Sequence, residues 1–350
     1  MMIFFNNGVC MDITKLILNV AVLFVMMIPG IILKKCKMIS DAFGKGISNL
    51  VLYIAQPCLI VCAYLDCTLS FSEIWLKVVL VFVFSILAHI LFSAVALFCF
   101  GKAPESKQRM LRFATIFSNA AFMGIPLIQA VCGSEAAIYA SIYNITFNLF
   151  LWTLGVHLCT TQKGVDHDGD GDADLVDAMI GFHKTTKKES SITKVLFHPV
   201  TLASVIGVIF LILGFNRHTF EIGFVWDCLS MLKGLVAPLS MVVIGLRFAD
   251  IKWKGAFADQ HMYWFLALRH ILLPLVVMAM IKLVVLCGLS VPTVAQDVVI
   301  IMAATPAASS ATMFAEKYDC DAAYVSRLVV VSTILCIATM PLIIGLSHMI

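Results

Sequence analysis

The chain has 350 residues, of which 61% are hydrophobic and only 13% are charged, and its formal net charge is +3 at pH 7. An ordinary soluble domain is about 25% charged, so this composition excludes a typical soluble protein and indicates a polytopic membrane protein. The twelve cysteines form no cluster with metal-ligand spacing. They are expected to be small buried thiols and not a disulfide framework.

Ten stretches have the apolar character and the length of a membrane-spanning helix, which needs about 20 residues. In chain order they are residues 13–33, 45–65, 74–100, 110–131, 136–159, 196–215, 229–248, 263–287, 294–314 and 323–346. The predicted fold is therefore an all-α polytopic membrane protein with ten transmembrane helices. Pro274 and Pro341 lie inside spans, where we expect kinks. Gln56 beside Pro57 is interpreted as a pore or hinge residue, with a structural kink as the alternative.

The basic residues are distributed unevenly between the connections of these spans. Eighteen of the 24 Lys and Arg residues fall in or beside the odd-numbered connections. Cytoplasmic loops carry an excess of Lys and Arg, so the odd-numbered connections are predicted to be cytoplasmic and both termini to lie outside. The expected location is the plasma membrane (the inner membrane of the cell).

The fifth connection is polar and divides the chain into halves with five spans each. The predicted parts are a first repeat at 1–159, a cytoplasmic loop at 160–194 and a second repeat at 195–350. An odd number of spans per half means that the second half enters the membrane from the opposite side. Proline spacing agrees, since Pro57 and Pro126 are 69 residues apart and Pro238 and Pro306 are 68 apart. The pattern predicts an inverted repeat, and the alternative is that the prolines align by chance.

Two spans, the fourth and the ninth, contain residues that break helices. The fourth carries Asn119, Gly124 and Pro126, and the ninth carries the run 305–312 with Pro306. Backbone groups freed by a break must be satisfied by protein or by a water-filled cavity when they lie in lipid. Interrupted spans in corresponding positions of two halves indicate the binding site of a transporter.

The run Asn119-Ala-Ala-Phe-Met-Gly-Ile-Pro-Leu127 resembles the Asn-x-Gly-Phe-x-Gly-x-Pro signature of the auxin efflux carrier family, which includes bacterial malate-type permeases. Residues 304–318 and 326–341 resemble the same family. The resemblance implies ten helices in a five-plus-five inverted repeat, with the broken fourth and ninth helices crossing near the midplane. It also implies organic anions, such as dicarboxylates or the auxin carboxylate, as substrates. Ala121 stands where the family often has Gly, so the identity of the substrate does not transfer.

Broken helices suit an anion because a helix N-terminus presents unpaired N–H groups and the positive end of a dipole. The expected substrate-binding residues of the two interruptions are Ser118, Asn119, Gly124, Pro126, Thr305, Pro306, Ser309, Ser310 and Thr312. The alternative for each Ser or Thr is helix packing or a hydrogen bond to its own backbone.

Four polar residues of other spans are further candidates for substrate binding. Asn144 and Asn148 are four residues apart and share one helix face, with an interhelical hydrogen bond as the alternative. Arg269 can attract a carboxylate and His270 can take up a proton, because ionisable residues inside a membrane are costly and indicate function. The alternative for Arg269 is that its side chain reaches the membrane interface.

The fifth connection contains a run with the spacing of a calcium-binding EF-hand loop. Its candidate ligands are Asp166, Asp168, Asp170, Asp172, Asp174 and Asp177, with Gly171 at the sharp turn. The run predicts a site for Ca²⁺ or Mg²⁺. Asp in place of Glu at the last position favours weaker binding, and the alternative is a solvated acidic linker.

The sequence predicts a secondary transporter for a small organic anion that works by alternating access around crossed broken helices. The alternatives are a cation-coupled antiporter or a bile-acid-type symporter and, from another class, a calcium-responsive membrane sensor on the same scaffold. No enzyme motif stands out, and no cofactor is expected for transport. The expected partners are the anion and the lipid bilayer, with no nucleic acid and with a homodimer left open.

Overall fold

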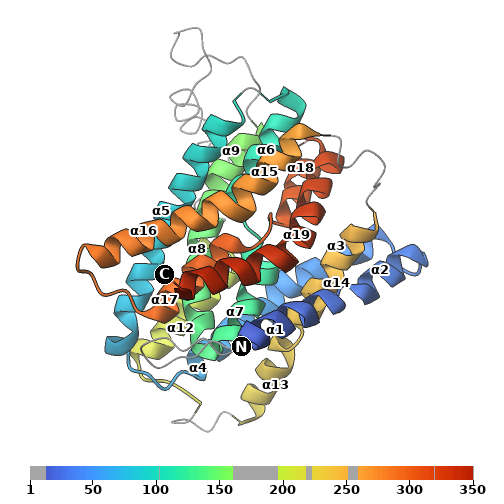
Figure 1. Cartoon of the computed structure of the whole chain (residues 1–350). Coiled ribbons are helices and arrows are strands. Elements are labelled where there is room, and N and C mark those ends of the chain that lie inside the picture. Colours follow the sequence, from blue (N-terminus) through green and yellow to red (C-terminus); the bar gives the residue numbers. More distant parts are fainter. Residues whose placement is uncertain are drawn as a thin grey trace.

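The computed structural model describes residues 13–101, 103–160, 196–217, 223–250, 259–318 and 320–349. The regular elements in these ranges are helices, and Figure 1 shows their arrangement. The first half contains α1 (Ile13–Val25), α2 (Ile28–Lys35), α3 (Asp41–Leu50), η1 (Val51–Ala55), α4 (Gln56–Leu65), α5 (Phe71–Cys99), α6 (Glu105–Ile116), η2 (Ala120–Gly124), α7 (Ile125–Cys132), α8 (Ser134–Phe150), η3 (Leu151–Gly155) and α9 (Val156–Thr160). The second half contains α12 (Pro199–Ile212), α13 (Gly223–Lys233), α14 (Val236–Ala249), α15 (Gln260–Ala267), η4 (Leu268–Leu272), α16 (Leu273–Leu286), α17 (Thr293–Ala304), α18 (Ser310–Lys317) and α19 (Ala322–Met349).

Seven helical stretches of the described residues are long and apolar enough to cross a membrane. They are Ile17–Lys35, Ala42–Leu65, Phe71–Cys99, Ser134–Cys159, Gly223–Ala249, Gln260–Leu286 and Ala322–Met349. Three shorter apolar helices, Ala120–Cys132, Pro199–Ile212 and Thr293–Ala304, overlap the predicted fourth, sixth and ninth spans. The prediction of an all-helical membrane protein is confirmed.

Each of three prolines inside the spans follows a turn of π-helix. Pro57, Pro126 and Pro274 occupy the second positions of α4, α7 and α16, directly after η1, η2 and η4. In all three cases the residue before the proline donates its N–H to a carbonyl five residues earlier. Proline lacks an N–H and clashes with the carbonyl four residues before it. The wider turn relieves this clash, so the helix continues past the proline.

Helices α2 and α14 lie side by side (Figure 1) because two glycines let their backbones touch. A Cβ atom at Gly30 would lie 2.2 Å from the carbonyl oxygen of Val242, and one at Gly245 would lie 2.1 Å from that of Met27. Small residues allow this close approach where lipid supplies no hydrophobic driving force between helices. Helix α12 packs along α4 in another long contact between the halves, where Gly207 lies against the ring of Tyr64.

Polar contacts join the connections of the chain in two sets. One set joins odd-numbered predicted connections: Lys34–Asp250 (3.3 Å), Lys45–Glu316 (2.9 Å), Lys107–Asp259 (3.0 Å) and Arg109 to the carbonyl of Cys159 (3.4 Å). The other set joins even-numbered connections and the end of α19: Asp66–Arg217 (2.6 Å), Lys77–Glu135 (3.0 Å) and Asp297–His348 (3.2 Å). Each end of the molecule is therefore held by its own ion pairs.

Candidate functional site

Two helices stop in the middle of the molecule, and the segments that follow them pair with each other. Helix α6 ends before residues 117–119, and α17 ends before residues 305–309. We call these segments the first and the second interruption. An isolated antiparallel bridge pairs Ser118 with Ala307. The interruptions that the sequence placed in different halves therefore meet in space.

Backbone hydrogen bonds on both sides of this bridge hold the two interruptions together. The N–H of Asn119 donates to the carbonyl of Pro306 at 2.7 Å. The N–H of Ala308 donates to the carbonyl of Phe117 at 2.9 Å. Because water is scarce in the interior of a membrane protein, these bonds satisfy backbone groups that the broken helices leave free.

Arg269 bonds to the C-terminal ends of α6 and α17, the two helices that precede the interruptions. It lies in η4 with a side chain that is 0% exposed. Its Nε and Nη2 donate to the carbonyl of Thr305 at 3.2 and 2.8 Å, Nη2 also donates to Ala303 at 3.1 Å, and Nη1 donates to Thr115 at 3.1 Å. These carbonyls belong to the C-terminal ends of α17 and α6, where the helix dipole is negative. One guanidinium therefore caps two broken helices.

His270 and Ser332 support the second interruption. The hydroxyl of Ser332 accepts the N–H of Ala307 at 3.0 Å and lies 2.8 Å from Nε2 of His270. The hydroxyl of Thr339 lies 3.1 Å from Nδ1 of His270 and donates to the carbonyl of Leu335. Every donor has an acceptor if Ser332 donates to Nε2 and Nδ1–H donates to Thr339. This arrangement requires a neutral imidazole.

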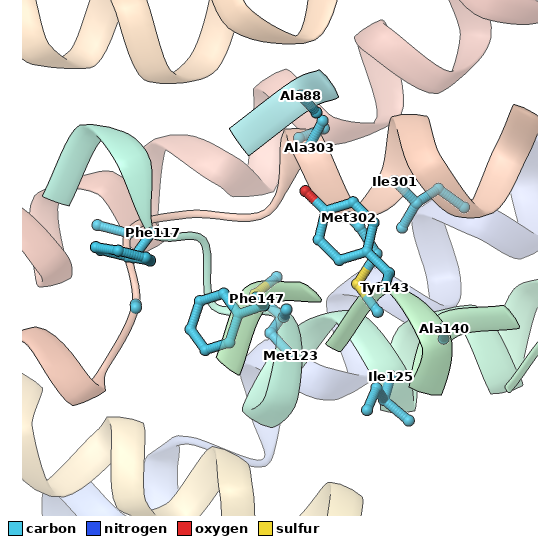
Figure 2. Close-up of a cluster of buried hydrophobic side chains, with 14 of the residues drawn as sticks. Ala88, Phe117, Met123, Ile125, Ala140, Tyr143, Phe147, Ile301, Met302 and Ala303 are labelled. Atoms are coloured by element: carbon cyan, nitrogen blue, oxygen red, sulfur yellow. The ribbon is translucent and has the colours of Figure 1, made fainter. Parts of the chain in front are cut away.

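Apolar side chains close one side of the paired interruptions. Figure 2 shows Phe117, Tyr143, Phe147 and Met302 in one cluster drawn from the first interruption, α8 and α17. The rings of Phe117 and Phe147 meet edge to face with centroids 5.8 Å apart. A Cβ atom at Gly124 would lie 2.5 Å from Sδ of Met302. Gly124 therefore allows η2 to approach α17, which gives this residue a packing role.

A cavity of about 130 Å³ adjoins the first interruption. One part of its wall is polar and consists of Asn49, Gln56, Ser118, Asn119, Asn144, Asn148, His198 and Ser310. The other part is aromatic and consists of Tyr53, Phe122, Phe147, Trp152 and Phe314. We call this cavity the amide pocket. Its combination of an apolar wall with a few convergent polar groups is typical of small-molecule sites.

Several polar atoms of the amide pocket are buried and have no hydrogen-bond partner among the described residues. They are Oε1 of Gln56, Oγ of Ser118, Nδ2 of Asn119, Oδ1 of Asn144, Nδ2 of Asn148 and Oγ of Ser310. Buried polar atoms in proteins are nearly always hydrogen-bonded. These atoms make the amide pocket the candidate binding site.

The structure brings five of the predicted substrate-binding residues together at the amide pocket: Ser118, Asn119, Asn144, Asn148 and Ser310. The others lie around it in different roles. Arg269 bonds to the carbonyls of Thr305 and Thr115, and His270 bonds to Ser332, which accepts the N–H of Ala307. The carbonyl of Pro306 accepts the N–H of Asn119, and the Thr305 hydroxyl donates to the carbonyl of Met302. Pro126 follows η2, Ser309 is buried beside the start of α18, and Thr312 lines a separate cavity.

Gln56 is the pocket residue whose role the sequence left most open. Its Nε2 donates to the carbonyl of Ala121, and its Oε1 is buried without a partner among the described residues. A glutamine beside a proline inside an apolar span was the available signal. The aromatic wall gave no such signal, because the chain has 25 Phe residues and they occupy buried and exposed positions alike.

The amide pocket is lined by neutral side chains, with no Lys, Arg, Asp or Glu among the described residues of its wall. The buried guanidinium of Arg269 bonds to the carbonyls of Thr115 and Thr305, which lie three positions before Ser118 and two before Ala307. The EF-hand-like run at 166–177 lies outside the described residues, so the predicted metal site stays a prediction.

Comparison with known proteins connects this architecture to a family. Residues 15–344 match the model of a family described as "Membrane transport protein". An uncharacterized transporter of Methanothermobacter thermautotrophicus is 25% identical over 331 residues, which are 94% of this chain and 96% of that relative. The similarity extends through both interruptions and all helices that line the amide pocket.

Proposed function

Because the chain belongs to the auxin efflux carrier family of membrane transport proteins, we propose that it is a secondary transporter that binds a small organic anion in the amide pocket. The observation that carries the proposal is the set of unsatisfied buried polar atoms around one cavity at the paired interruptions. Asn119, Asn148, Ser118 and Ser310 supply neutral donors to a bound carboxylate. The aromatic wall contacts the apolar part of the same molecule.

An anion fits the electrostatics of this region. Arg269 is completely buried, and no carboxylate of the described residues lies within ion-pair distance of its guanidinium. The partial negative charges of two helix C-termini offset only part of this charge. An uncompensated charge in the membrane interior is costly. A substrate anion held beside the first interruption lowers this cost, whereas a cation raises it.

We further propose ten membrane spans in a five-plus-five inverted repeat, with the interruptions as the crossing of the fourth and ninth spans. In such a repeat the first span corresponds to the sixth, and the second corresponds to the seventh. A contact between the first and seventh spans is therefore matched by a contact between the sixth and second. The packing of α2 with α14 and of α12 with α4 is such a matched pair of contacts. The two sets of ion pairs support alternating connections at the two ends of the molecule.

The position of the amide pocket supports alternating access. One group of helices, α2 to α4 and α12 to α14, supplies Gln56, Tyr53 and His198 to its wall. A second group, α5 to α8 and α15 to α19, supplies Asn119, Asn144 and Ser310 with the interruptions. A pocket between two groups opens to either side when the groups move against each other.

Location and coupling belong to the proposal as well. We place the protein in the plasma membrane, with the odd-numbered connections and residues 160–194 in the cytoplasm and with both termini outside. No carboxylate of the described residues lines the pocket, which favours an anion transporter over a cation-coupled antiporter or symporter. The calcium-responsive sensor and the homodimer remain predictions.

Uptake by purified protein in proteoliposomes tests the function. Labelled mono- and dicarboxylates are supplied with and without a pH gradient, and Asn119→Ala is compared with Gln296→Ala. Gln296 bonds to the carbonyl of Val291 away from the pocket, so it is a matched amide control. We expect uptake of at least one carboxylate, lost in Asn119→Ala and kept in Gln296→Ala. Absence of carboxylate movement by the wild-type protein would refute the proposal.

A further inference from the structure

His89 is a buried imidazole that the binding site described above does not use. It lies inside α5 with a side chain that is 0% exposed. Its Nδ1 lies 2.7 Å from the carbonyl oxygen of Ser85. Because a carbonyl only accepts hydrogen bonds, Nδ1 carries the proton of the neutral ring. Nε2 keeps its lone pair, and this atom has no hydrogen-bond partner among the described residues.

Aromatic rings surround the imidazole of His89. The ring of Phe150 is stacked on it with centroids 5.1 Å apart, and the ring of Tyr143 lies at 5.3 Å. Phe147 and Phe92 lie at 6.2 and 6.4 Å. A cation within about 6 Å of an aromatic centroid is attracted by the ring. These rings therefore stabilise an imidazolium without an acidic partner.

Phe147 connects His89 with the amide pocket. Its side chain lines the pocket, and its ring meets the imidazole edge to face. Figure 2 shows Phe147 in one cluster with Tyr143 and Phe117 of the first interruption. A charge in the pocket and a charge on His89 thus lie on two sides of one aromatic ring. Such charges interact strongly, because the protein interior has a low dielectric constant.

Arg269 is the charged group that acts on His89 among the described residues. Its guanidinium packs over the ring of Phe92 at 5.6 Å, and Phe92 is also a neighbour of the imidazole. His270, which follows Arg269 in η4, bonds to Ser332 instead.

Helix α5 also packs against α6, α8, α16 and α17, and the titratable group that these helices place against the imidazole is Tyr143. The other titratable groups with described side chains on these helices and on α5 lie toward the helix ends: Glu73, Lys77, Cys99, Lys107, Arg109, Arg112, Glu135, Tyr139, Lys282 and Asp297. Glu135 bonds to Lys77, and Asp297 bonds to His348. Within the described part of the chain, His89 therefore faces a cation and no carboxylate.

This arrangement links the binding of a proton to the binding of an anion. A proton on Nε2 places a second positive charge beside Arg269 in the membrane interior, which is costly while the amide pocket holds no anion. An anion in the pocket supplies the missing negative charge and lowers this cost. Coupling between two binding sites is reciprocal, so the proton on His89 also strengthens the binding of the anion.

We propose that His89 binds a proton together with the anion in the amide pocket, so that the transporter moves the two in the same direction. The inference rests on the proposed function and adds the coupling ion to it. The proton needs no carboxylate in the pocket wall, because the lone pair of an imidazole nitrogen binds it.

Accumulation in proteoliposomes tests this coupling. Labelled lactate, pyruvate and succinate are supplied at pH 7 outside and pH 8 inside, and potassium with valinomycin holds the membrane potential at zero. The wild type is compared with His89→Gln, His89→Phe and His261→Gln, after subtraction of protein-free liposomes. His261 is the matched control, because it lies at the start of α15 and bonds to Asp259 away from the amide pocket.

At equilibrium, a gradient of one pH unit concentrates an anion that moves with one proton up to about tenfold. We expect the wild type and His261→Gln to accumulate at least one probe toward this limit. His89→Gln and His89→Phe should bring the same probe only to equal concentrations on both sides. If neither variant carries a probe, the wild type should take up about one proton per chain from weakly buffered detergent solution when the probe is added, and the variants none.

Two outcomes would overturn the inference and leave the proposed function intact. One is a wild type that equilibrates a probe but does not accumulate it. The other is equal accumulation, or equal proton uptake, by the wild type and the His89 variants. If His89→Gln does not fold, His89→Phe decides, because it keeps a ring among the aromatic neighbours. Movement of none of the probes by the wild type would instead refute the proposed function.

Discussion

The two interruptions pair through the same backbone bonds, yet their surroundings differ. The first interruption faces the amide pocket with Ser118 and Asn119, whose side chains carry buried atoms without partners. The second is held by protein on its other side, where Arg269 binds the carbonyl of Thr305 and Ser332 binds the N–H of Ala307. One broken helix thus presents polar groups to a ligand, and the other fixes its position.

This difference separates stability from binding in one small region. Changes to residues that hold the interruptions should alter the free energy of unfolding first, and among them only Arg269 should also alter anion binding, through its charge. Changes to residues that face the amide pocket should alter transport and leave stability unchanged. Arg269→Gln, Ser332→Ala and Gly124→Ala should therefore lower stability, whereas Asn119→Ala should lower transport.

Arg269→Gln should have the largest effect, because this side chain serves both interruptions. Its loss leaves the carbonyls of Thr115, Ala303 and Thr305 without their charged donor. We expect the free energy of unfolding to fall by at least about 3 kcal/mol, measured by denaturation in detergent. Arg269→Lys should recover part of the loss. Wild-type stability in Arg269→Gln would show that the guanidinium does not hold the broken helices.

Ser332→Ala should affect the second interruption alone. It removes the acceptor of the Ala307 N–H and the partner of His270, and leaves a buried donor unsatisfied. The expected cost is about 1–3 kcal/mol in the free energy of unfolding. Thr333→Ala is the control, since its hydroxyl bonds to the carbonyl of Val329 within the same helix. Equal losses in the two variants would contradict a special role for Ser332.

Gly124→Ala should disturb the first interruption by crowding. The new methyl group would meet Sδ of Met302 at 2.5 Å, and this flexible side chain must move. Overpacking typically costs about 1–3 kcal/mol, and a thermal melt measures it. The double variant with Met302→Ala should recover most of the loss, because the smaller side chain makes room. No recovery would place the cause in the backbone of η2.

Asp259→Asn should have the smallest effect, because it lies far from both interruptions at the start of α15. Burial disfavours its charged form, but hydrogen bonds from Tyr324, Lys107 and His261 outweigh burial and lower the pKa of the carboxyl to about 2. A lowered pKa contributes stability above the ordinary value near 4, and the contribution is lost as the pH falls toward 2. The difference in melting temperature between wild type and variant should shrink from pH 6 to pH 3. An unchanged difference would mean that the carboxylate charge contributes nothing.

Much of this arrangement could be predicted from apolar lengths and helix-breaking residues alone. Asn119, Gly124 and Pro306 marked both interruptions, since such residues are costly inside a span. Arg269 was recognised as unusual, but its partners were not predictable, because backbone carbonyls in another part of the chain leave no trace in the sequence. Asn144 and Asn148 reach the amide pocket because α8 packs beside α7, a tertiary contact that periodicity cannot specify.

Uptake and stability measured together for Asn119→Ala and Ser332→Ala distinguish substrate binding at the first interruption from support of the second. We expect Asn119→Ala to raise the KM or to lower the uptake rate about tenfold or more, with an unchanged melting temperature. We expect Ser332→Ala to melt at a lower temperature but to keep the wild-type KM per folded molecule. A wild-type KM and rate in Asn119→Ala, or a raised KM in Ser332→Ala alone, would contradict the assignment of binding to the first interruption.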